Sequence, residues 1–215
     1  MSLVVAIKDK DRVVFGSDKQ ASTGNTNKSH DATKIWEVPD IPGAIMGSVG
    51  SVRVSQIIQY NKLIDLNDAA ENGIIDTKFI INSVVPVIIA QLQANGINCT
   101  TQKDEDNIVY PMIPNVFLFA IGDRAWMIWH DLSVTELGEY LAIGSGSDVA
   151  NGALFATKNK NPFERIVTSI CAAADSTLFV DDGVDFLATK YYNKDKKLIA
   201  NALNIDLDAI IIEEE

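Results

Sequence analysis

The sequence predicts an α+β fold in which two β-sheets are stacked between outer layers of helices, a four-layer αββα sandwich. The chain has 215 residues, of which 47% are hydrophobic, so it can bury a sizeable core. Segments of strand composition and of helical periodicity follow the order strands, two helices, strands, two helices, strands. In a layered domain each sheet then buries one face against the other sheet and one against helices. We expect one domain over residues 1–215, because no linker or internal repeat divides the chain.

The N-terminal quarter predicts strands, because runs of β-branched and aromatic residues alternate with turn residues. The first two runs are separated by the charged turn Asp9–Asp11, which is typical of a hairpin. The expected strands are Val4–Ile7, Val13–Phe15, Lys34–Val38 and Ile41–Val49.

The period changes at Ser51, which could cap a helix. Apolar residues then recur at helical spacing over about four turns, at Val54, Ile57, Ile58 and Ile64. A second helix is expected over Thr77–Asn95; it is apolar nearly all round and therefore buried between layers. We expect Pro86 to kink or split this helix and Gly96 to end it.

The second half of the chain repeats the pattern after a polar segment, Thr100–Asn107, which we interpret as a loop or an excursion at the surface. Three strands are expected at Val116–Ile121, Ala125–His130 and Tyr140–Ile143. Helical periods follow at Asp148–Thr157 and Phe163–Ala174. The C-terminal part predicts an extended segment, a short helix and a last strand, at Val184–Tyr191, Lys194–Leu203 and around Ile210.

Composition excludes several partners and compartments. The 18 basic and 29 acidic residues leave a net charge of -11, which opposes binding to nucleic acid. The longest apolar stretch, Phe79–Leu92, is interrupted by polar residues and shorter than the roughly 20 residues of a membrane span. The N-terminal apolar run is too short for a signal peptide, and the two cysteines, Cys99 and Cys171, suit no disulfide framework. We therefore expect a cytoplasmic protein without membrane or nucleic-acid partners.

Histidine-based and metal-based chemistry are also disfavoured. The two histidines, His30 and His130, have no second ligand type at metal spacing, so we expect no metal and no cofactor. The segment Gly144–Ser147 is neither a nucleophile elbow nor a phosphate-binding loop. Nucleophilic chemistry would then need a hydroxyl that is activated without histidine.

Ser2 offers such a hydroxyl, because its small side chain favours removal of Met1 and leaves a free α-amine on the same residue. An α-amine has a reference pKa near 8 and can accept the proton of the hydroxyl. The site would also need a cation, a carboxylate to orient it, and backbone N–H groups for an oxyanion. Lys34, Asp18 and the glycines of Gly47–Gly50 could meet these needs.

The N-terminal motifs resemble the opening of proteasome β-type subunits and especially of the bacterial HslV-type peptidases. These motifs are Leu3–Lys8, Gly16–Ser22, Gly24–Thr26 and Lys34–Ile35. The resemblance implies that Ser2 occupies the place of the family's N-terminal threonine nucleophile. It places Asp18 and Lys34 on the family's aspartate and active-site lysine, without a gap between the three.

Two later motifs agree with the resemblance. Gly50 matches the glycine whose N–H forms the oxyanion hole, and Ala142–Ser147 matches a Gly-Ser-Gly motif that places Ser145 near the nucleophile. The family has the N-terminal nucleophile hydrolase fold, and its members form stacked homo-oligomeric rings that cleave peptides or unfolded proteins, in some cases with an unfolding ATPase. Where the family has an aspartate and a serine near the nucleophile, this chain has Thr177 and Val180, so one hydroxyl is lost.

Three functions are compatible with these observations. The first is a proteasome-like peptidase in which Ser2 forms an acyl-enzyme. The second is an inactive ring subunit that retains Met1 and serves assembly or binding. The third is a small-amide hydrolase, which is disfavoured because the resemblance is to peptidases.

Overall fold

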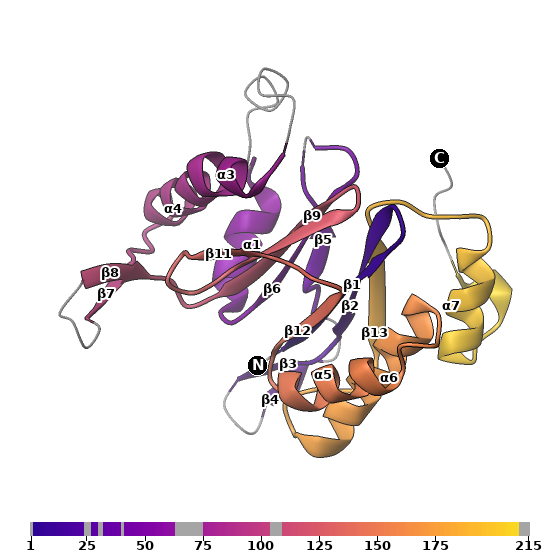
Figure 1. Cartoon of the computed structure of the whole chain (residues 1–215). Helices are drawn as coiled ribbons and strands as arrows, with labels where there is room; N and C mark the ends of the chain where they lie inside the picture. Colours follow the sequence, from indigo (N-terminus) through magenta and orange to yellow (C-terminus); the bar gives the residue numbers. More distant parts are fainter. Residues whose placement is uncertain are drawn as a thin grey trace.

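Two stacked sheets with helices on both outer faces form the body of the protein (Figure 1). This computed structural model describes residues 2–23, 27–29, 32–39, 41–62, 75–103 and 109–210. The predicted α+β sandwich of four layers is confirmed.

The first sheet has four antiparallel strands, and the N-terminal strand is one of the two central ones. Its order is β12 (Tyr140–Gly144), β1 (Leu3–Asp9), β2 (Arg12–Asp18) and β13 (Val184–Ala188). In its register Leu3 lies opposite Gly144 and Val4 lies opposite Ser17. The start of β1 is thereby placed beside the ends of β12 and β2.

The second sheet has five strands and is also antiparallel. Its order is β11 (Val134–Glu136), β10 (Arg124–Ile128), β9 (Val116–Ile121), β6 (Ala44–Val49) and β5 (Ile35–Glu37). The short edge strand β11 has no counterpart among the sequence-based expectations. Of the other four strands, β9 has the expected bounds and the remaining three lie within three residues of theirs.

Alternation along the strands divides the core into layers. In β1, Val4 and Ala6 face the other sheet, whereas Leu3, Val5 and Ile7 face the helices. The cluster between the sheets also contains Val13, Phe15, Ile35, Ile45, Leu118, Ala120, Ala125 and Met127. One strand pattern therefore fills two different core layers.

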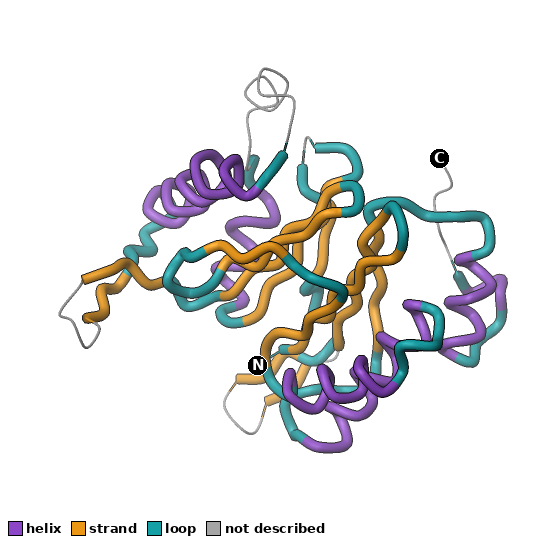
Figure 2. The backbone as a smooth tube through the Cα atoms, viewed as in Figure 1, coloured by secondary structure: helices purple, strands orange, loops and turns teal. Residues whose placement is uncertain are grey.

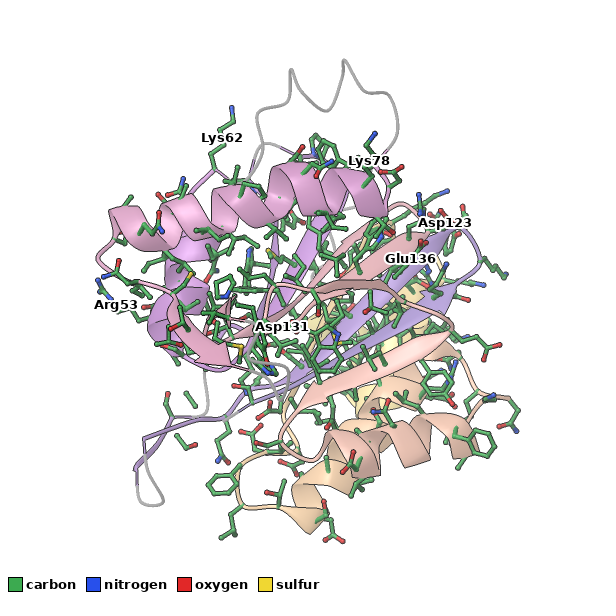
Figure 3. All side chains as sticks on the ribbon, turned by 60° about the vertical axis from the view of Figure 1, so that its left-hand side comes forward. Arg53, Lys62, Lys78, Asp123, Asp131 and Glu136 are labelled. Carbon is green, nitrogen blue, oxygen red and sulfur yellow. The ribbon has the colours of Figure 1, made fainter. Side chains whose placement is uncertain are left out.

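Helices cover the outer faces as the periodicity predicts (Figure 2). The five-stranded sheet is covered by α1 (Val52–Tyr60), α3 (Thr77–Phe79), η1 (Ile80–Val84) and α4 (Val85–Ala94). The four-stranded sheet is covered by α5 (Ser147–Ala156), α6 (Pro162–Ser176) and α7 (Asp195–Leu203). Side chains fill the spaces between the layers, while Arg53, Lys62 and Lys78 reach outward (Figure 3).

The expected helix Thr77–Asn95 is continuous, and its proline is accommodated rather than breaking it. The turn Ile80–Val84 is π-helical, with Val85 N–H donating to Ile80 O, immediately before Pro86. A wider turn relieves the clash that a proline ring has with the preceding turn. Gly96, with φ of +76°, ends the helix as expected.

This helix is also the one described segment long and apolar enough to cross a membrane, judged by length and composition. The same test is passed by core helices of proteins without a membrane span. Here Ile80, Val84, Ile88 and Leu92 are fully buried against the five-stranded sheet, which accounts for the apolar composition.

Of the two readings of Thr100–Asn107, a loop or an excursion at the surface, the loop is wrong for the first half. Thr100–Lys103 forms β7, which pairs with the unexpected strand β8 (Val109–Met112), and residues 104–108 lie outside the description. This hairpin extends away from the two sheets (Figure 2). Its strands pair only with each other among the described residues, so hydrophobic patterning gives no signal for them.

Smaller differences concern caps and ends. A second hairpin, β3 (Ala21–Thr23) with β4 (Asn27–Ser29), follows the first strands. Ser51 precedes α1 but makes no side-chain cap, and Ile64 lies outside the described residues. The expected strand at Ile210 is not formed there; a short 3-10 helix, η2 (Leu207–Ala209), ends before it.

Candidate active site

Ser2 lies immediately before β1, and the peptide that joins it to Leu3 is held on both sides. Leu3 N–H donates to Asp18 Oδ1 at 2.7 Å. The carbonyl of Ser2 accepts a hydrogen bond from the Ser145 N–H at 2.9 Å. Ser2 is 9% exposed, so the position of its side chain is restricted by both the sheet and the neighbouring turn.

Gly144 is required for this arrangement. Its φ is +99°, in the region that favours glycine, and a Cβ there would lie 2.0 Å from Ser2 O. The turn after β12 can therefore approach the backbone of Ser2 only because residue 144 lacks a side chain. The Gly-Ser-Gly motif acts here through its backbone, with Ser145 donating its N–H.

Asp18 and Lys34 form a buried ion pair behind Ser2. Lys34 Nζ lies 2.5 Å from Asp18 Oδ1, the oxygen that also accepts the Leu3 N–H, while Asp18 Oδ2 accepts from Gln20 N–H at 3.2 Å. The Lys34 side chain is 4% exposed and the Asp18 side chain is 0% exposed. The ammonium is thus held within two hydrogen-bond lengths of the Leu3 amide.

Burial shifts both titrations of this pair. It raises the pKa of the Asp18 carboxyl and lowers the pKa of the Lys34 ammonium, and the attraction between the two charges opposes both shifts. Apart from the ion pair, Lys34 Nζ has no hydrogen-bond partner among the described residues. The described part of the chain leaves the remaining N–H groups of this ammonium without an acceptor.

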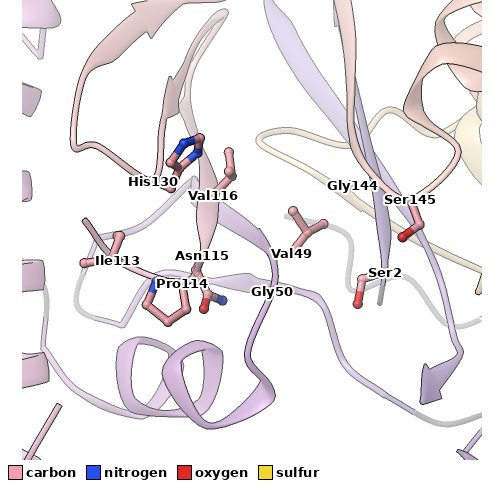
Figure 4. A pocket seen from close by; sticks show the side chains of 10 residues that line it. All are labelled: Ser2, Val49, Gly50, Ile113, Pro114, Asn115, Val116, His130, Gly144 and Ser145. Atoms are coloured by element: carbon pink, nitrogen blue, oxygen red, sulfur yellow. The ribbon is translucent and has the colours of Figure 1, made fainter. Parts of the chain in front are cut away.

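Two cavities meet at Ser2 and Gly50. The smaller, of about 290 Å³, has polar walls that include Lys34, Thr33, Ser48 and Gln56. The larger, of about 610 Å³, is lined by Ser2, Val49, Gly50, Ile113, Pro114, Asn115, Val116, His130, Gly144 and Ser145 (Figure 4). A chain that crosses Ser2 would meet a polar hollow on one side and a more apolar one on the other.

Gly50 occupies the junction between β6 and α1. Its φ is +124°, and a Cβ would lie 2.3 Å from Pro114 O and 2.9 Å from Asn115 Cγ. Asn115, which is 1% exposed, hydrogen-bonds to Ser51, the next residue along the chain. Sequence reasoning missed Asn115, because only the tertiary pairing of β6 with β9 brings residues 64 positions apart into contact.

The structure brings the expected site residues together in one region. Ser2, Lys34 and Gly50 border the smaller cavity, Ser145 borders the larger, and Asp18 lies behind them in contact with Lys34. Their proposed roles stay predictions. Met1 and His30 lie outside the described residues.

The two departures from the family pattern have different settings. Val180 is 4% exposed and belongs to the core cluster that α6 and the four-stranded sheet share. Thr177 is the C-cap residue of α6. Within the described ranges no group of three histidine, cysteine, aspartate or glutamate side chains could hold a metal ion.

Comparison of the sequence finds no matching protein-family profile and no matching curated protein. Comparison of the structure does find relatives. Thiobacillus denitrificans BPH in complex with epoxomicin is similar with a TM-score of 0.66 at 18% identity, covering 86% of this chain and 97% of that one. The eukaryotic HslV from Trypanosoma brucei has a TM-score of 0.57 at 18% identity, covering 86% and 98%.

These likenesses cover nearly the whole of the compared proteins. The chain therefore has the fold of the HslV-type, proteasome-like peptidases, and the resemblance seen in the N-terminal motifs is confirmed at the level of the fold.

Proposed function

We propose that the chain is an HslV-like peptidase in which Ser2, exposed by removal of Met1, is the nucleophile. The observation that carries this proposal is that one carboxylate oxygen of Asp18 contacts two groups beside Ser2. Asp18 Oδ1 contacts both the Leu3 N–H and Lys34 Nζ, and Lys34 borders the same cavity as Ser2 and Gly50. Ser2, Lys34 and Gly50, which would supply the nucleophile, the cation and the oxyanion donor, therefore line one cavity.

In the proposed reaction the α-amine of Ser2 takes the proton of its hydroxyl, and Oγ attacks the carbonyl carbon of a peptide bond. Gly50 N–H stabilises the oxyanion. The C–N bond then breaks, the leaving amine takes up the proton, and an ester of Ser2 remains. Water hydrolyses this ester, with the α-amine again accepting a proton, and restores the hydroxyl.

Lys34 supports this chemistry by charge. An ammonium close to Ser2 favours the forming alkoxide and disfavours protonation of the neighbouring α-amine. Asp18 orients the ammonium. The Asp18 carboxylate is itself held by backbone N–H groups of β1 and of the segment after β2. In this scheme Asp18 does not contact the substrate.

The proposal extends to the setting of the reaction. We propose a single proteasome-like domain over residues 1–215 that assembles in the cytoplasm into stacked homo-oligomeric rings. Its substrates would be peptides or unfolded proteins, with a possible unfolding ATPase and without cofactor, nucleic acid or membrane. The HslV likeness supports the ring assembly.

The test combines intact mass, labelling by epoxomicin and casein hydrolysis. We expect a mature chain that begins at Ser2, gains one inhibitor mass and cleaves casein. Ser2→Ala should abolish labelling and cleavage, whereas Thr168→Ala, which removes a hydroxyl on the outer helix α6, should leave both unchanged. A mature protein that begins at Ser2 and neither labels nor cleaves would refute the proposal.

One observation favours the second candidate, a ring subunit without activity. Val180, which the resemblance matches to a family serine, is buried in the core and supplies no hydroxyl. This candidate expects Met1 to be retained on the cellular protein and no cleavage, so the same mass measurement separates the two.

A further inference from the structure

The carboxamide of Asn115 joins the start of β9 to the junction between β6 and α1. Its Oδ1 accepts the Ser51 N–H at 3.0 Å, and its Nδ2 donates to Ser51 O at 3.2 Å. One side chain thus grips both backbone polar groups of the residue that follows Gly50.

A small serine network completes this contact. Asn115 Nδ2 also lies 2.8 Å from Ser48 Oγ and 3.2 Å from Ser55 Oγ, and Ser55 Oγ donates to Ser48 Oγ at 3.1 Å. Because the Ser51 N–H can only donate, the atom that faces it must be the amide oxygen, which fixes the orientation of the carboxamide. Asn115 and Ser48 are 1% and 2% exposed, so water does not compete for these bonds.

Gly50 itself has a backbone conformation that residues with a Cβ rarely adopt. Its φ is +124°, which glycine reaches without strain, so the local backbone does not fix how this peptide is oriented and neighbouring contacts must do so. Pro114 and Asn115 crowd Gly50 on the side where a Cβ would point, and Asn115 holds Ser51 directly after it. The start of β9 therefore sets how the peptide at Gly50 lies.

We propose that Asn115 is a positioning residue for the oxyanion hole: by binding the backbone of Ser51, it fixes the orientation of the preceding Gly50 peptide, whose residue lines the cavities beside Ser2. This inference rests on the proposed function. Oxyanion donors act by being preorganised, and small displacements of a catalytic group have large effects on rate. Asn115 would then influence the tetrahedral intermediate more than the binding of the substrate.

A buried amide with several hydrogen bonds also stabilises the fold, so the test must separate the two effects. A peptide aldehyde adds to Ser2: Oγ bonds to the aldehyde carbon, the hydroxyl proton passes to the former carbonyl oxygen, and a hemiacetal results. That oxygen occupies the oxyanion hole, whereas the corresponding peptide alcohol forms no such adduct. The ratio of the two inhibition constants therefore cancels the contacts that the two peptides share and reports on hemiacetal formation, which includes the contacts of the oxyanion hole.

We expect Asn115→Ala and Asn115→Asp to reduce the preference for the aldehyde about 10- to 100-fold, with a similar fall in kcat and a KM within about threefold. Asn115→Asp retains the acceptor for Ser51 N–H and loses the Nδ2 donor. The matched control is Asn161→Ala, which removes the side-chain acceptor at the start of α6 and should leave the ratio and kcat within about twofold.

The outcomes are distinct. Suppose that a folded Asn115 variant loses thermal stability as Asn161→Ala does but keeps its preference for the aldehyde. That result would overturn the positioning role and leave the proposed peptidase function standing. If Asn115→Ala does not fold, Asn115→Asp decides alone by the same ratio. Absence of any aldehyde adduct on the wild-type protein refutes the proposed function itself, and the inference with it.

Discussion

Replacing Lys34 by Met should destabilise the protein strongly, because it leaves the Asp18 carboxylate buried without its counter-charge. Asp18 is 0% exposed, and its Oδ1 lies 2.5 Å from Lys34 Nζ. Breaking a buried pair by removing one partner costs about 3–5 kcal/mol. For a chain of this length each kcal/mol lowers Tm by about 2–4 °C, so we expect a decrease of about 6–20 °C.

The measurement is urea unfolding at pH 7 and at lower pH, at one protein concentration. Asp18→Asn combined with Lys34→Met should recover stability to within about 2 kcal/mol of wild type, because both buried charges are then gone. The exposed pair Lys158–Glu139, at 3.6 Å, supplies the control: Lys158→Met should cost at most about 1 kcal/mol.

The pH dependence has a definite sign. Burial raises the pKa of Asp18 in the folded protein above its ordinary value, and Lys34→Met removes the charge that opposes this shift. The carboxyl is then neutral at low pH without penalty, and the deficit grows as the pH rises from about 4 through the raised pKa. A loss below about 1 kcal/mol at pH 7, or a deficit that grows on acidification, would refute the reasoning.

Three further perturbations test other parts of the structure. Gly144→Ala should cost more than about 2 kcal/mol and abolish labelling of Ser2, because φ is positive and the new Cβ meets the Ser2 carbonyl; thermal melting and inhibitor mass check this. Burial raises the pKa of Tyr191 to about 12. Between pH 10 and that value the unfolding free energy of the wild type should therefore fall by up to about 1.4 kcal/mol per pH unit relative to Tyr191→Phe. The measurement is urea unfolding, and an equal pH dependence of the two proteins would contradict this. Arg12→Met should cost about 3–5 kcal/mol by leaving Asp195 buried and unpaired, while the labelling rate of folded protein stays unchanged; a slower rate would show coupling to the site.

The sequence predicts most of the fold because packing and patterning agree in its main elements. The central strands of both sheets are nearly continuous runs of apolar and small residues that are buried on both faces, and α6 combines an N-cap at Asn161 with a buried stripe. The hairpin of β7 and β8 lacks such a signal, because its strands pair only with each other among the described residues. Of the strand expected around Ile210, only Ile210 is described, and it follows the 3-10 helix η2 without forming a strand.

The candidate site shows the same division. Ser2, Asp18 and Lys34 could be chosen from the chemistry they would supply and from their spacing. Asn115 could not, because a single asparagine before a strand has no distinctive pattern, and its contacts join segments far apart in the chain. The role of Gly144 likewise depends on how closely β12 approaches the first strand.

Anchoring of the peptide bond between Ser2 and Leu3 has a consequence for how such a protein would mature. Its N–H is bound by Asp18 and its carbonyl by Ser145, both through contacts that involve no atom upstream of Ser2. Removal of Met1 would then cleave one peptide bond without changing the contacts that hold Ser2 and Leu3. Activation would need no refolding, and its rate would be set by access of the trimming enzyme.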